Sequence, residues 1–311
     1  MPILLKPAQD EFLLGVIGRL THLNIGSSCV ETMRSLVAHF ELEEKHRPAT
    51  GRHHQTEAYL EALASTSGKS VFEFLFDHSN FAAQGVMPTP AVAAPWLYRR
   101  MHRTKIKPYS HRTRLQLCKK CLPEQVRNLG FPFWHRQHQL DGIYWCPVHA
   151  TPLLALDGWP AQDTLIPVAT VASQRTPASA ADFEKYPVLR SVCDVMTGFL
   201  RHPLLDNVTR IDDCLREQAV ARGLCRHDGD PAMPSDLSFL TDLAFNACPA
   251  WWLRKVFRLR KETARIGDSA LHNVFSGRGR ASSVSYALAL ALLLSPRERA
   301  DMLDRPSDPS S

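Results

Sequence analysis

The sequence of 311 residues has no aspartate or glutamate between His78 and Pro123. Nine cations fall in this acid-free window: Arg99, Arg100, Arg103, Lys105, Lys107, Arg112, Arg114, Lys119 and Lys120. In a chain of net charge +6, such a window is either a solvated basic face or a surface that contacts phosphate groups. We predict that these nine residues bind nucleic acid or a protein partner.

The sequence also lacks the apolar segments that secretion and membrane insertion require. No apolar stretch follows a basic start at the N-terminus, so no secretory signal is expected. The longest apolar run, 286–294, is too short to span a bilayer and predicts a buried helix. The cysteines favour a metal site over a disulfide framework, which indicates a reducing cytoplasm. We therefore expect a cytoplasmic protein with no membrane partner.

Motifs of the common enzyme classes are missing as well. The sequence has no Gly-x-Ser-x-Gly and no His-Glu-x-x-His, and it lacks the glutamate of the zinc deaminases. Gly68-Lys69-Ser70 looks like the end of a phosphate-binding loop, but the position of the first glycine is occupied by Leu63. We expect no catalytic residues and no enzyme activity.

The sequence does contain two short pairs of potential metal ligands, Cys118-Lys-Lys-Cys121 and Cys146-Pro-Val-His149, separated by twenty-four residues. Each pair can offer two ligands to one ion from a tight turn, and four S and N ligands complete a tetrahedral zinc site. A site closed by four protein ligands is structural. We predict one structural Zn²⁺ held by Cys118, Cys121, Cys146 and His149. His135 and His138 lack a thiol at short spacing and rank below His149.

The periodicity of apolar residues predicts a mainly α fold. We expect an N-terminal helical region (1–95), a basic segment with a zinc-finger module (96–155), a C-terminal helical domain (156–303) and a disordered tail (304–311). Helices are expected near 11–23, 29–40, 56–64, 70–77, 182–200, 208–223, 235–246, 250–260, 269–275, 282–294 and 296–303. Asp10 and Ser70 are expected to cap the helices that follow them.

Two features of these helices allow more than one interpretation. The pair around Ser67-Gly68 has helix-turn-helix spacing, yet an ordinary antiparallel helix pair has the same pattern. Residues 251–261 mix aromatic and basic side chains at helical spacing. Their plain interpretation places Trp252, Val256 and Leu259 in the core and the cations in solvent.

Four blocks of sequence resemble the TniQ/TnsD family of transposon target-selection proteins. They are Asp10-Glu11 followed by a helix with Arg19, the first cysteine pair with Leu122-Pro123-Glu124, the block Phe133-Trp134-His-Arg136, and the run from Cys146 to Leu154. A weaker similarity continues through Trp252-Leu253-x-x-Val256-Phe257-Arg258 and His272. The chain departs from the family at Lys119-Lys120, where a proline is usual, and it is shorter than long TnsD proteins.

The resemblance implies a bacterial, nucleoid-associated adaptor that links a target-recognising complex or target DNA to an AAA+ transposition regulator of the TnsC type. Some family members read an attachment site directly. Others dimerise and sit on an RNA-guided CRISPR effector complex, which reads the target by base pairing. A direct, sequence-specific attachment-site binder is therefore the alternative within the family, and a stand-alone zinc-containing transcription regulator is an alternative outside it.

Overall fold

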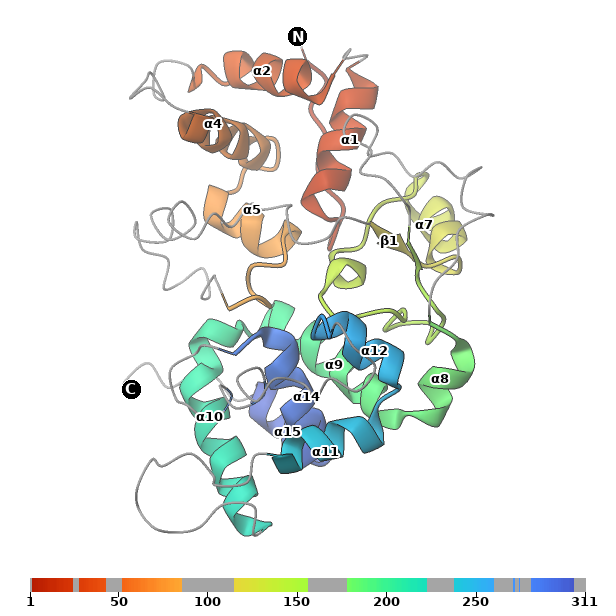
Figure 1. The fold of residues 1–311 in the computed structure, drawn as a ribbon. Helices are drawn as coiled ribbons and strands as arrows, with labels where there is room; N and C mark the ends of the chain where they lie inside the picture. The colour runs from red at the N-terminus through yellow and green to blue at the C-terminus, as the bar shows by residue number, and fades with distance from the viewer. Residues whose placement is uncertain are drawn as a thin grey trace. The chain divides into compact units, whose positions relative to one another are not determined.

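The computed structural model describes residues 2–24, 28–42, 52–85, 115–155, 178–222, 238–259, 271, 274 and 281–304. The chain divides into two compact units. The first comprises residues 1–81, 90–139 and 153–175, and the second comprises residues 82–89, 140–152 and 176–311. Almost all regular structure is helical, as predicted (Figure 1).

The first unit begins with helices that pack in sequence order. They are α1 (Leu13–Leu23), α2 (Cys29–His39), α4 (Arg52–Ser65) and α5 (Val71–His78). Ser70 caps α5 as expected, because its hydroxyl accepts from the Glu73 N–H while the Glu73 carboxylate accepts from the Ser70 N–H. Helix α2 contacts both α1 and α4, and α4 contacts α5. The predicted helix pair around Gly68 is therefore present.

A short two-stranded sheet completes the first unit. Strand β1 (Gln116–Leu117) pairs antiparallel with β2 (Leu154–Ala155). Between them come α7 (Cys121–Leu129) and the 3₁₀ turn η2 (Arg136–Gln139). A hydrophobic cluster joins this sheet to α1 and α7, and it consists of Phe12, Leu14, Leu115, Leu117, Leu122, Trp134 and Leu154.

The second unit is built around α14 (Ser283–Leu293). Its sequence carries no charged residue, and nearly every side chain is buried, as the apolar run predicted. Helix α9 (Pro187–Arg201) packs most extensively against it, and α10 (Leu204–Ala221) and α11 (Ser238–Ala247) also contact it (Figure 1). The remaining helices are α8 (Ala180–Lys185), α12 (Ala250–Val256) and α15 (Pro296–Asp304). In the described part of the chain, no helix has both the length and the apolar character needed to cross a bilayer.

Several helix predictions need correction. Helix α1 starts at Leu13, and Asp10 does not cap it, since Asp10 adopts a left-handed backbone (φ 59°). The helix expected over 182–200 is two helices, because Pro187 occupies the first turn of α9 and the residue before a proline avoids helical geometry. Two apolar residues of the first two helices, Leu23 and Val30, are 40% and 42% exposed, so the apolar faces of these helices are only partly covered. Of the helix expected at 269–275 only residues 271 and 274 are described, and tail residues 305–311 lie outside the described part.

Candidate metal centre

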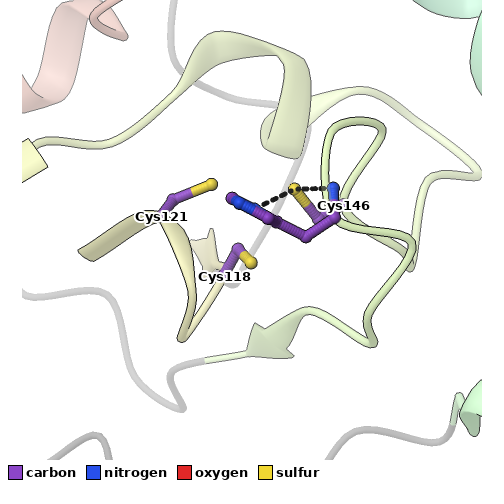
Figure 2. A group of neighbouring side chains, drawn as sticks. Cys118, Cys121 and Cys146 are labelled. Carbon is purple, nitrogen blue, oxygen red and sulfur yellow. Dashed lines mark hydrogen bonds between the residues drawn. The ribbon is translucent and has the colours of Figure 1, made fainter. Parts of the chain in front are cut away.

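The four predicted metal ligands lie together. The ligand atoms of Cys118, Cys121, Cys146 and His149 are all within 4.8 Å of one another. Figure 2 shows the three thiols turned toward one shared space. The cysteines are buried and His149 is half-buried, so the donors are largely shielded from water. His135 and His138 are not members of this cluster.

The geometry of this cluster fits zinc. A tetrahedral ion with Zn–S of about 2.3 Å and Zn–N of about 2.0 Å separates its sulfur and nitrogen ligands by about 3.5 Å. Cys146 Sγ and His149 Nδ1 are 3.6 Å apart. The backbone N–H of His149 also donates to Cys146 Sγ at 3.4 Å, which gives the sulfur a second stabilising partner. Three thiols and one imidazole can therefore hold one metal ion, and the donor set is one that zinc takes.

Two buried amide side chains fix the segments that carry the first ligand pair. Gln139 accepts from the Gln116 N–H at 2.9 Å and donates to the Gln116 carbonyl at 2.7 Å, which holds β1 just before Cys118. Gln125 does the same for α7, since it donates to the Phe133 carbonyl at 3.0 Å and accepts from the Phe133 N–H at 3.1 Å. Each side-chain amide bonds both the N–H and the carbonyl of one residue, as a neighbouring strand would. These buried backbone groups therefore have hydrogen-bond partners.

The second ligand pair lies in a tight loop closed by its own backbone. The Cys146 N–H donates to the Thr151 carbonyl at 2.8 Å, and the Ala150 N–H donates to the Cys146 carbonyl at 2.8 Å. Ala150 has a positive φ of 52°, which turns the chain back toward Pro152, and Pro152 forms a bridge with Trp145. These bonds set the spacing between the thiol of Cys146 and the imidazole of His149.

A buried ion pair joins the start of the domain to α1. Arg19 donates from Nε to Glu11 Oε1 at 2.7 Å and from its terminal nitrogen to Oε2 at 2.6 Å. Glu11 is fully buried, and its Oε2 also accepts from the Ala8 N–H at 2.9 Å. The guanidinium lies 3.8 Å from the centroid of the Phe131 ring. A bidentate pair with its remaining bonds satisfied can remain charged in the interior.

A second ion pair joins the same segment to the block around Trp134. Arg136 donates from Nε to Asp10 Oδ1 at 2.6 Å and from its backbone N–H to the Asp10 carbonyl at 2.9 Å. It also donates to the Phe76 carbonyl at the end of α5. The Phe12 N–H donates to the Trp134 carbonyl at 2.6 Å. Two of the blocks that suggested the family resemblance are thus hydrogen-bonded to each other.

The predicted basic surface is described only at its end. Lys119 and Lys120 form the turn between the two thiols of the first pair, and both are exposed. The other seven predicted contacts lie outside the described residues: Arg99, Arg100, Arg103, Lys105, Lys107, Arg112 and Arg114.

The helix pair α4–α5 has an electrostatic character that the sequence pattern did not indicate. Helix α5 contains no lysine or arginine, and it carries Glu73 and Asp77. Lys69, just before the helix, pairs with Asp77 at 2.5 Å. A helix that enters the major groove approaches phosphates on both sides, so this composition disfavours such a role for α5.

Sequence reasoning missed α7 and the two clamping glutamines. The helix had a recognisable signal, because Glu124 lies in its first turn and Gly130 follows its last residue with a left-handed backbone (φ 81°). Gln125 and Gln139 had no such signal, since their partners are backbone groups of other segments. The structure alone identifies them as residues that position the metal ligands.

A family model described as TniQ matches residues 2–153. The match begins before Asp10 and ends after the second ligand pair, so it contains the whole candidate metal centre and both ion pairs. No curated protein sequence matches the chain. The TniQ family is a non-catalytic family of transposition proteins. Residues 2–153 therefore form a TniQ family domain.

Proposed function

We propose that the protein is a target-selection adaptor of a heteromeric bacterial DNA transposon. It links a target-recognising complex, or the target DNA itself, to an AAA+ transposition regulator of the TnsC type. One observation carries the proposal: the cysteine pairs, Asp10-Glu11 and the block Phe133–Arg136 form one connected structure inside the TniQ domain. An adaptor needs a defined framework to hold two partners in a fixed relation.

The metal has a structural role in this proposal. Cys118, Cys121, Cys146 and His149 would hold one Zn²⁺, and four protein ligands leave no position for a substrate or an activated water. The ion would supply folding free energy and fix the loop that carries the second ligand pair. The residues of the site then position the surface of the module and take part in no reaction.

The partners follow from the proposed role. Target DNA would be reached directly or through an RNA-guided CRISPR effector complex, and a homodimer is compatible with either arrangement. Lys119 and Lys120 lie exposed beside the metal ligands, where they can contact phosphate or an acidic protein surface. The seven cations from Arg99 to Arg114 would extend this basic surface.

A second candidate function is direct, sequence-specific binding to an attachment site. The presence of the α4–α5 helix pair favours it, because that arrangement is common in DNA-binding proteins. The acidic composition of α5 weighs against it. We therefore place the adaptor function first.

A recruitment assay separates the two. Purified full-length protein is incubated with the AAA+ regulator of the same element and with duplex DNA, carrying either the attachment site or a scrambled sequence, at several salt concentrations. The adaptor function predicts a stable complex with the regulator and weak, steeply salt-dependent DNA binding without sequence preference. Strong discrimination between the two duplexes would support direct recognition, and failure to bind the regulator would overturn the adaptor function.

Charge reversal tests the basic surface in the same assay. Replacing Arg99, Arg100 and Arg103 by glutamate should weaken the binding of DNA or of the partner while metal content and melting temperature stay unchanged. Replacement of Arg297, an exposed cation on α15, by glutamate serves as the matched control. If both variants bind DNA and the partner equally well, the basic window is a solvated surface that takes no part in binding.

A further inference from the structure

A row of four aromatic rings crosses the second unit, and a cation stands over each end. The ring row consists of Tyr144, Trp251, Trp145 and Phe183, in that order. Successive ring centroids are 5.5, 5.7 and 5.3 Å apart, and Trp145 and Phe183 are stacked at an interplanar angle of 21°. No part of this row belongs to the metal ligand set or to the ion pairs of the TniQ domain.

The cations at the two ends are Lys255 and Arg190. Lys255 Nζ lies 5.9 Å from the centroid of Tyr144, and the guanidinium carbon of Arg190 lies 5.3 Å from the centroid of Phe183. Both side chains are exposed. Each pair is within the range of a cation–π interaction, which orients the cation and leaves its N–H groups available to an anion.

Hydrogen bonds hold the two indole rings of the row in place. Trp145 donates from its indole N–H to the Ser179 carbonyl at 2.8 Å, and Trp251 donates to Asp182 Oδ2 at 3.2 Å. Trp145 and Phe183 are buried and form the floor of the row, whereas Tyr144 and Trp251 are half-buried and reach the surface. The surface ring of Trp251 is therefore held in place before a ligand binds, which lowers the entropy cost of binding.

The charge around the ring row is predominantly positive. Helix α12 contains no acidic residue. The cations on α8, α9, α12 and the turn after α12 are Lys185, Arg190, Arg201, Arg254, Lys255 and Arg258. The acids on α8 and α9 are Asp182, Glu184 and Asp194, of which Asp194 lies in electrostatic reach of Arg190. Asp182 is already bonded to the indole of Trp251 and to the N–H of Ser179. The surface therefore favours an anionic ligand that also presents flat apolar faces.

We propose that the ring row and its two end cations bind an unpaired nucleic-acid strand. Bases would stack on Trp251 and Tyr144, and phosphates would contact Lys255 and Arg190. Base stacking on aromatic side chains tolerates any sequence, as a target selector that meets many sites requires. A duplex keeps its base faces stacked internally, so it cannot use the rings. The inference deepens the proposed adaptor function and rests on it for the class of ligand.

Fluorescence anisotropy with the full-length protein tests the inference. The probes are labelled oligothymidine, an oligouridine of equal length and a duplex of equal length. The double variant Lys255→Gln/Arg190→Gln should lower the affinity for single strands and reduce the slope of log K against log salt by about 1.4, or roughly 0.7 for each lost phosphate contact. Trp251→Ala should weaken binding by about tenfold or more, and Trp251→Phe should restore most of it.

Matched controls keep the result interpretable. Arg297→Gln, which removes an exposed cation outside the ring row, should leave the affinity unchanged. Metal content and melting temperature show whether each variant is folded. The glutamine double variant alters only exposed side chains, so it tests the site even if Trp251→Ala does not fold.

Three outcomes would overturn the inference: no single-strand binding by the wild type, tighter binding of the duplex, or equal binding by wild type and variants. Each leaves the adaptor function standing, because the recruitment assay measures that function through the AAA+ regulator. A preference for oligothymidine identifies a DNA strand as the ligand, and a preference for oligouridine identifies RNA; either supports the site.

Discussion

Asp10 and Arg136 are 126 residues apart in the sequence and are joined by two hydrogen bonds, one between side chains at 2.6 Å and one between backbones at 2.9 Å. The same guanidinium donates to the last turn of α5 through the Phe76 carbonyl. One side chain thus connects the N-terminal segment, a helix of the helix pair and the loop between the two metal-ligand pairs. Asp10 has a left-handed backbone, and its carboxylate accepts from Arg136. A helix-capping carboxylate would instead accept from backbone N–H groups in the first turn of the helix.

Removing this arginine should destabilise the domain. Arg136→Met deletes all its side-chain bonds while keeping the apolar stem, and we expect a loss of about 2–4 kcal/mol in the free energy of unfolding. Arg127→Met on the exposed face of α7 is the matched control and should change stability by less than about 0.5 kcal/mol. Urea unfolding followed by tryptophan fluorescence measures both. Equal stabilities would show that Arg136 has no structural role.

Gly15 should not tolerate a methyl group. A Cβ at this position would lie 3.2 Å from Trp134 Cδ1 and 3.3 Å from Glu11 Oε1, both parts of rigid, buried groups. Gly15→Ala should therefore cost about 1–3 kcal/mol, although alanine favours helices by about 1 kcal/mol. Ser35→Ala, at an exposed position in α2, reports the propensity effect alone. A Gly15→Ala protein that is more stable than the wild type in urea would contradict the packing argument.

Loss of a single thiol should remove the metal. Cys118→Ser and Cys146→Ser are each expected to abolish stoichiometric zinc and to lower the melting temperature, because structural metal binding is coupled to folding. Cys29→Ser, outside the cluster, should keep both properties. Elemental analysis and thermal melting, repeated after chelation of the wild type, provide the measurement. Unchanged metal content in both cluster variants would refute the zinc assignment.

A buried carboxyl in the second unit predicts how stability depends on pH. Burial raises the pKa of Asp212, on α10, from 3.8 to about 6. Between these values the unfolded chain has lost the proton that the folded protein keeps. The free energy of unfolding should therefore fall as pH rises from about 4 to about 6, by on the order of 2–3 kcal/mol, and this contribution should be level above pH 6.

Asp212→Asn should remove this decline and raise stability at pH 7. Asp213→Asn changes the neighbouring exposed carboxyl, whose side chain is 58% exposed, and should leave the pH profile intact. Urea unfolding at pH values from 4 to 8 compares the three proteins. If the Asp212→Asn protein showed the same pH profile as the wild type between pH 4 and 6, the assignment to Asp212 would be disproved.

The metal centre could be predicted from sequence because its information is local. Each ligand pair fits one tight turn, so spacing alone identifies Cys118, Cys121, Cys146 and His149. The helix α14 was equally accessible, since an apolar run of that length has few alternatives. Composition and periodicity sufficed for these features because each depends on neighbours along the chain.

Contacts between distant segments were not accessible in this way. Aspartate is a residue type that often caps helices, so the sequence predicted this role for Asp10. The carboxylate instead accepts from Arg136, which is far away in the sequence. Gln125 and Gln139 substitute for strand partners, a role that no local pattern records. The ring row likewise draws its members from three separate stretches, so the residues around Trp251 alone indicated an ordinary core helix.

The pairing of Asp10 with Arg136 also constrains how the protein is made. A ribosome adds roughly 5–20 residues per second, so on the order of ten seconds pass between the synthesis of the two residues. During that interval Asp10 lacks its partner Arg136, Trp134 is not present to pack on Gly15, and His149 is made later still. The TniQ domain therefore cannot complete its fold until the residues from Trp134 to His149 have been synthesised.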